Sequence, residues 1–75
     1  MTLEDGKYIA VPYEDYQHPR LPPYWIAGVK YGAEVRGGKM HLGSENGEVT
    51  YRNPEFSDLA FLFSFRKVDN FDEVT

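Results

Sequence analysis

Apolar and polar residues alternate strictly from Trp25 to Val35, and this is the clearest pattern in the chain. Alternation with a period of two is typical of a β-strand that buries one of its faces. The pattern predicts one long strand over 25–35, which Gly28 and Gly32 on its outer face would allow to bend. The positions expected to face inward are Trp25, Ala27, Val29, Tyr31, Ala33 and Val35.

Two hairpin signals follow this strand, at Gly37-Gly38 and at Asn46-Gly47. Such pairs suit the two-residue turns that join antiparallel strands. They separate two shorter alternating runs, at 39–43 and 48–52. Residues 25–52 are therefore predicted to form a three-stranded antiparallel meander. The further inward positions are Met40, Leu42, Val49 and Tyr51.

The segment before the meander contains a short strand and a loop. Residues 7–13 are apolar and partly β-branched, which predicts a strand. Pro12 has no N–H to donate, so it ends that strand or confines it to a sheet edge. Residues 14–24 contain closely spaced prolines and predict a rigid, extended loop without helix.

The C-terminal part has two interpretations. Residues 59–68 fit the apolar stripe of a helix, and they also fit a strand in which Phe61 and Phe63 point into the core. We favour the strand because phenylalanine alternates with other residues, and an asparagine before a proline predicts a single turn of helix at 54–58. Residues 69–75 form an acidic tail that we expect to fray.

Together these elements predict a mostly β fold with a single domain over residues 1–75. The expected architecture is a small antiparallel five-stranded meander curled into a barrel or half-barrel. The alternative is an α+β fold, in which a four-stranded sheet carries one C-terminal helix.

The composition limits what can support so short a chain. It has no cysteine, which excludes disulfides and thiolate metal sites, and only two histidines, so we expect neither a metal nor a cofactor. A chain of this length buries only about 60% of its unfolded surface. Six tyrosines, five phenylalanines and one tryptophan supply aromatic surface to share, so we expect a homo-oligomer, first of all a dimer.

The sequence also gives an expectation for location. No apolar run approaches the roughly 20 residues of a membrane span, and the acidic N-terminus is unlike a signal peptide. The lack of cysteine suits a reducing compartment. We therefore expect a cytoplasmic protein that does not contact membranes.

No residue pattern points to catalysis, and we expect a protein that is not an enzyme. His18 and His41 fall in different elements, and neither has a nucleophile or catalytic carboxylate motif beside it. The run Gly37-Gly38-Lys39 lies between two predicted strands and lacks the spacing of a phosphate loop.

The loop around the prolines concentrates the residue types that most often anchor protein interfaces, tyrosine, tryptophan and arginine. Its rigidity lowers the entropy lost on binding. Our leading hypothesis is a non-enzymatic binding protein that docks on another protein, as a small inhibitor or adaptor of the phage-like accessory kind. The expected partner-binding residues are Tyr13, Tyr16, Arg20, Tyr24 and Trp25.

Basic residues on the predicted outer face of the meander support two alternatives. The first is an oligomeric protein that binds or sequesters a small nucleotide-like anion. The second is a nucleic-acid-binding small barrel, which is the least favoured because the net charge is −4 and few aromatics interrupt the basic residues. The residues that would bind the anion are Lys30, Arg36, Lys39, His41 and Arg52.

Overall fold

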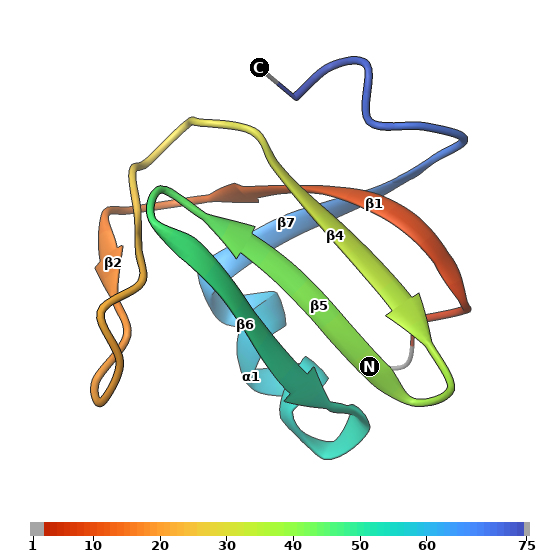
Figure 1. Ribbon diagram of the computed structural model, residues 1–75, viewed down its shortest axis with the longest axis horizontal. Helices are drawn as coiled ribbons and strands as arrows, with labels where there is room; N and C mark the ends of the chain where they lie inside the picture. The colour runs from red at the N-terminus through yellow and green to blue at the C-terminus, as the bar shows by residue number, and fades with distance from the viewer. Residues whose placement is uncertain (1–2, 75) are drawn as a thin grey trace.

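Antiparallel strands dominate the computed structural model, which describes residues 3–74, so the fold is mostly β. The main strands are β1 (Gly6–Pro12), β4 (Tyr31–Arg36), β5 (Lys39–Ser44), β6 (Gly47–Arg52) and β7 (Phe63–Val68). They form one five-stranded sheet in the order β6-β5-β4-β1-β7 (Figure 1). Two shorter strands, β2 (Tyr16–Gln17) and β3 (Tyr24–Trp25), pair with each other in a separate hairpin.

The predicted meander is confirmed as β4-β5-β6. Arg36 pairs with Lys39 across a turn made by Gly37 and Gly38, which have φ angles of 59° and 80°. Only glycine adopts such left-handed angles without strain, which explains why this pair makes the turn. The inward positions predicted on β5 and β6 are buried, apart from Tyr51, which is partly exposed.

The single long strand predicted over 25–35 is wrong, because the chain turns between Ile26 and Val29. The N–H of Val29 bonds to the carbonyl of Ile26 at 3.2 Å, and Gly28 has a φ of 79°. The N–H of Gly28 is held instead by the carbonyl of Pro12 at 3.1 Å. Val29, predicted to be inward, is 37% exposed at this turn.

The strand predicted over 59–68 is right only for its second half. A 3₁₀ turn, η1 (Asn53–Glu55), leads into the helix α1 (Phe56–Leu62), and β7 follows directly. The Glu55 carboxylate accepts the N–H of Arg52 at 2.9 Å, which caps the start of this helical segment. Phe63 is buried as predicted, whereas Phe61 points outward from α1 and is 82% exposed, so its predicted core position is wrong.

The sheet curls but does not close. β7 returns to pair with β1 instead of continuing the meander beside β6, and β6 does not pair with β7 within residues 3–74. Figure 1 shows β1 and β7 crossing behind the meander, with α1 behind β5 and β6. The structure is therefore an open half-barrel and not a closed barrel. The alternative with a C-terminal helix is also wrong, because a fifth strand follows α1.

The core lies on the concave side of the curled sheet. Apolar side chains from β1, β4, β5, β6 and β7 meet there with two residues of α1 and with Trp25 from β3. Burial of this apolar surface is the main source of stability in a chain without disulfides. The largest fully buried side chains of this core are Trp25, Phe56, Phe63, Met40, Leu42 and Val35, whereas Ile9 is buried on the other face of the sheet, opposite Gly32 in the register.

The acidic segment after β7 lies on the convex side of the sheet. The Phe71 ring sits where a side chain at Gly32 would be, 3.3 Å from the position of a Cβ atom. The Glu73 carboxylate bonds to Lys30 at 3.2 Å and also to Arg66. These hydrogen bonds, first that of Arg66, hold the pKa of Glu73 below its usual range. That this tail frays in solution stays a prediction.

Candidate docking groove

The hairpin of β2 and β3 is built around one glutamine side chain. The Nε2 atom of Gln17 lies 3.0 Å from the carbonyl of Leu21, and the carbonyls of Pro22 and Pro23 are within 3.2 Å of it. The Nδ1 atom of His18 accepts the N–H groups of Arg20 and Leu21 at 3.1 and 3.0 Å. The proline-rich loop is therefore ordered by its own side chains, as the prediction of a rigid connection implies.

Two aromatic residues join this hairpin to the core. Trp25 is 1% exposed, and its indole N–H donates to the carbonyl of Gly43 at 2.7 Å. The Tyr16 ring stacks on the Trp25 ring with their centroids 5.5 Å apart, and both rings contact the edge or face of Phe63. The hairpin is thus fixed to the sheet by its own base, where the two strands pair.

The turn between β5 and β6 binds the other side of the hairpin. Asn46 accepts the N–H of Tyr24 at 3.2 Å and donates to the carbonyl of Pro22 at 3.2 Å. The hydroxyl of Tyr31 donates to Glu45 at 2.7 Å and accepts the N–H of Ile26 at 2.8 Å. Burial, with a smaller contribution from the neighbouring Glu45 carboxylate, raises the pKa of Tyr31 to about 12.

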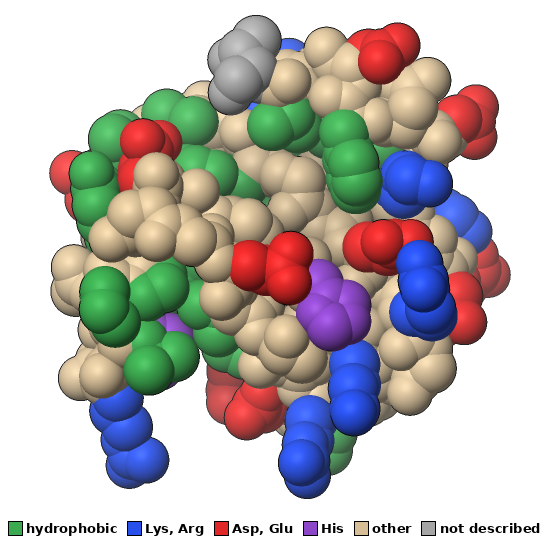
Figure 2. All heavy atoms as spheres, in the orientation of Figure 1, with side chains coloured by type: hydrophobic (Ala, Val, Ile, Leu, Met, Phe, Trp, Pro, Cys, Tyr) green, Lys and Arg blue, Asp and Glu red, His purple; other side chains and the backbone are tan. Residues whose placement is uncertain are grey.

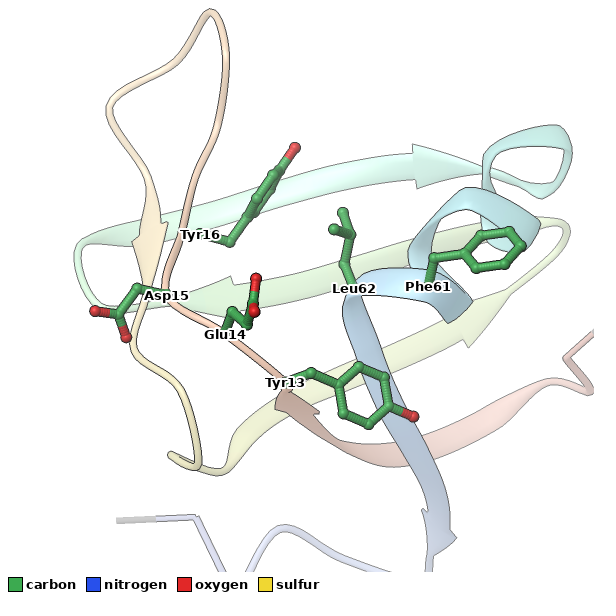
Figure 3. Close-up of a pocket in the computed structure, with 6 residues that line it drawn as sticks. All are labelled: Tyr13, Glu14, Asp15, Tyr16, Phe61 and Leu62. Atoms are coloured by element: carbon green, nitrogen blue, oxygen red, sulfur yellow. The ribbon is translucent and has the colours of Figure 1, made fainter.

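An open groove of about 410 Å³ lies where the chain leaves β1 and passes the end of α1 (Figure 3). The N–H of Tyr13 donates to the carbonyl of Leu62 at 3.0 Å and so joins the two walls. Tyr13 to Tyr16 form one wall, and the last turn of α1 forms the other. The residues that line the groove are Tyr13, Glu14, Asp15, Tyr16, Phe61 and Leu62.

Two exposed aromatic rings flank this groove. Phe61 is 82% exposed and Tyr13 is 62% exposed, the two largest exposures among the large apolar side chains described. A single exposed apolar residue is ordinary, but two aromatics beside one groove form a patch suited to binding. Tyr16 continues the aromatic surface inward, where it is partly buried against Trp25.

The two carboxylates of the groove differ in their surroundings. Asp15 accepts the N–H of Ala27 at 2.8 Å, and Figure 3 shows it pointing away from the helix wall. Glu14 projects between Tyr13 and Tyr16 in that view and has no hydrogen bond or ion pair to any residue in the described part of the chain. No lysine or arginine lines the groove.

The structure separates the residues predicted to bind a partner. Tyr13 and Tyr16 line the groove, whereas Arg20 lies at the exposed tip of the hairpin and Tyr24 is exposed elsewhere on it. Trp25 is buried in the core, where it holds the hairpin. The sequence analysis did not predict Glu14 and Phe61 as site residues. The helical stripe formed by Phe56 and Leu59 is the signal that places Phe61 on the exposed face of the helix.

The residues predicted to bind an anion are also divided. Arg36, Lys39 and Arg52 occupy successive register positions at one end of β4, β5 and β6, and Figure 2 shows basic side chains grouped there. Lys30 lies apart from them and pairs with Glu73. His41 contacts Thr50 at 3.0 Å and lies 3.6 Å from Glu48.

This basic group is partly neutralised by its own neighbours. Arg36 pairs with Glu34 at 2.8 Å, and the hydrogen bond lowers the pKa of that carboxyl. The described residues contain no cluster of histidine and acidic side chains that could hold a metal ion. They also contain no helix with the length and apolar character needed to cross a membrane.

Comparison with known proteins gives no further guide: no family model, curated protein or solved structure matches this chain.

Proposed function

We propose that this protein is a non-enzymatic docking protein, an inhibitor or adaptor, whose groove receives a lysine or arginine side chain from a partner protein. The observation that carries the proposal is the 82% exposure of Phe61 directly beside the groove. One exposed phenylalanine would be ordinary, but Phe61 and Tyr13 leave two aromatic rings in solvent beside one groove, and a patch of this kind is typical of an interaction site.

The chemistry of the groove selects a cation. Aromatic faces attract lysine and arginine side chains, and arginine also stacks its flat guanidinium on them. Glu14 supplies a carboxylate that has no counter-ion within the described residues, and no basic residue among 3–74 lines the groove. The aromatic rings would contact the aliphatic stem of the partner's lysine or arginine, and Glu14 would form an ion pair with the charged end of the same side chain. A long basic residue anchors an interface in this way.

The basic end of the sheet is a weaker candidate for function. Its three cations share one face, but Arg36 is paired with Glu34, and none of the three lines the groove beside Tyr13. We therefore treat binding of an anion or a nucleic acid at this end of the sheet as a result that would contradict the docking proposal. A protein that binds an oligonucleotide or a nucleotide through these residues would refute the docking proposal.

Selection from a peptide library displayed on phage tests the proposal with the full chain. We expect the immobilised protein to enrich peptides that contain lysine or arginine, and Phe61→Ala to abolish the enrichment. Glu14→Gln removes only the charge, so it should weaken binding of the selected peptides by roughly tenfold, as expected for a partly desolvated ion pair.

Tyr24→Ala is the matched control. Tyr24 is an exposed aromatic of the same hairpin, but it lies outside the groove. Its truncation should leave the selected peptides bound as tightly as in the wild type. Equal loss with Tyr24→Ala, or enrichment that survives Phe61→Ala, would place binding elsewhere. Enrichment of acidic or purely apolar peptides would contradict the cationic partner.

A further inference from the structure

The edge of β6 presents unpaired backbone groups in a defined pattern. The N–H of Asn53 donates to the carbonyl of Gly38 at 2.8 Å, which places the odd-numbered positions of β6 in hydrogen-bonded pairs with β5. The N–H and carbonyl groups of Glu48 and Thr50 therefore point away from the sheet. They have no hydrogen-bond partner among residues 3–74.

The charges on the exposed side chains of β6 complement each other when the strand pairs antiparallel with a second copy of itself. Glu48, Thr50 and Arg52 lie on one face at alternate positions, and all are exposed. If a second copy lies antiparallel to β6 with its Thr50 opposite Thr50, each Glu48 faces an Arg52 of the other copy. Opposite charges at directly facing positions stabilise an antiparallel pair, whereas like charges oppose it.

The other face of β6 is also compatible with this register. Centring the pair on Thr50 places Val49 opposite Tyr51 of the second copy. Val49 is buried and Tyr51 is half-buried within their own copy, so these positions place apolar residues opposite each other and no charge on this face of the interface. The charged and apolar positions thus agree on a single register, which is what a strand needs to avoid slipping.

We infer that two copies of this chain associate through β6, antiparallel and centred on Thr50, to form one continuous sheet with two-fold symmetry. A contact between identical patches closes on itself, so it gives a dimer and not a filament. The inference goes beyond the docking function, because β6 contributes no residue to the groove.

The other edge of the sheet lacks this property. The N–H of Tyr13 donates to the carbonyl of Leu62, so the odd-numbered positions of β7 point their backbone groups outward. A self-pairing of β7 centred on Phe65 would place Lys67 opposite Phe63, with no opposite charge to meet it. A lysine on an edge strand is a common obstacle to strand pairing.

The interface is short, so the dimer should be weak. The N–H of Arg52 is already bound by Glu55, so the carbonyl of Glu48 in the facing copy finds that donor occupied. The N–H and carbonyl of Thr50 and the N–H of Glu48 can pair without rearrangement. Exposed ion pairs add little affinity, and their main effect is to fix the register. A small interface of this kind dissociates on dilution.

Sedimentation of the full chain over about 10 µM to 1 mM tests the dimer, since this range spans weak association. We expect the wild type to shift from monomer to dimer as concentration rises. By symmetry, Glu48→Arg and Arg52→Glu each replace two facing pairs of opposite charges with two pairs of like charges, and this repulsion should weaken dimerisation by about tenfold. The double variant restores opposite charges with an unchanged net charge, so it should dimerise like the wild type.

A cysteine at the centre of the interface gives a second test, because the chain has none of its own. In the expected pair the two residues at position 50 have Cα atoms about 5.5 Å apart, within the range of a disulfide. Thr50→Cys should form a covalent dimer on oxidation, and the exposed helix variant Ser57→Cys should do so far more slowly. A monomer at every concentration, or a dimer that ignores the charge changes while Thr50→Cys does not cross-link, would overturn the inference.

Discussion

At the scale of single residues, two tyrosine hydroxyls near the core have opposite surroundings. The hydroxyl of Tyr31 donates to Glu45 and accepts the N–H of Ile26. The hydroxyl of Tyr51 is buried and has no hydrogen-bond partner among the described residues. A buried polar group without a partner loses its hydration without compensation, so the same atom stabilises the fold at one position and costs free energy at the other.

Replacing each tyrosine with phenylalanine should therefore have opposite effects on the free energy of unfolding. Tyr51→Phe should raise it by up to about 1 kcal/mol, because an unsatisfied hydroxyl is removed. Tyr31→Phe should lower it by about 1–3 kcal/mol, because the N–H of Ile26 loses its acceptor. Urea unfolding followed by circular dichroism measures both. A loss of stability in Tyr51→Phe equal to that in Tyr31→Phe would show that Tyr51 does find a partner.

The same two hydroxyls predict sensitivity to alkali. Burial raises the pKa of each from its ordinary 10.0 to about 12. Because the folded state holds these protons more tightly than the unfolded state, their contribution to stability is complete below pH 10 and is lost as the pH rises towards 12. Stability measured in urea should fall over this interval, and Tyr51→Phe should reduce the fall. A curve that stays flat to pH 12 would contradict the raised pKa values.

At the scale of elements, the junction between α1 and β7 decides which phenylalanine is buried. Phe61 is the sixth residue of a seven-residue helix and faces solvent, while Phe63 begins the strand and contacts Trp25 and Tyr16. The period of the side chains changes from that of a helix to that of a strand between these two positions. Phe61 is therefore exposed at the surface, while Phe63, two positions later, is buried in the core.

Alanine at these two positions should separate stability from binding. Phe63→Ala should cost about 3–5 kcal/mol of unfolding free energy, as truncation of a buried aromatic leaves a cavity. Phe61→Ala should change stability by no more than about 0.5 kcal/mol, because the side chain is already in water. Thermal and urea unfolding of both variants check this. A large loss in Phe61→Ala would mean that its ring is buried in solution, and the groove would lose its outer wall.

The elements show where sequence reasoning succeeded. The meander was predictable because its turn signals and its alternation are local, as in the glycine pair at 37–38. The turn at 26–29 was not, because it depends on acceptors that Pro12 and Asp15 bring from another part of the chain. Around Phe61, helical and strand periods overlap in the sequence, and packing against the sheet decided between them.

The candidate site was predictable only in part. Tyrosine is enriched at protein interfaces, so Tyr13 and Tyr16 could be predicted as site residues from the composition of the loop alone. The second wall of the groove comes from α1, and nothing in the local sequence links Phe61 to Tyr13. Their proximity results from the pairing of β7 with β1, which carries the hydrogen bond between Tyr13 and Leu62.

At the scale of the whole molecule, the C-terminal tail closes the convex face. Phe71 packs on Gly32 in the middle of the sheet, and Glu73 links Lys30 to Arg66. The exposed ion pairs contribute little, so the ring contact is the main reason for the tail to stay in place. The C-terminal tail thus covers part of the convex face of the sheet.

A double-mutant cycle should measure this contact. Gly32→Ala places a Cβ atom 3.3 Å from the Phe71 ring, so the ring must shift by a few tenths of an ångström. Phe71→Ala should cost about 1 kcal/mol for a half-buried ring. We expect Gly32→Ala to destabilise the wild type but to be neutral or stabilising in the Phe71→Ala background, since alanine suits a strand better than glycine. Additive effects would indicate that the tail does not pack on Gly32.

The single tryptophan gives the molecule an internal optical signal. Trp25 is fully enclosed, its indole N–H is bound to Gly43, and its ring lies against Tyr16, which lines the groove. Fluorescence from such an indole is emitted at shorter wavelengths than in water and is hard for acrylamide to quench. A side chain that enters the groove would press on Tyr16 and change this emission. The protein can therefore report occupancy of its groove without any added label.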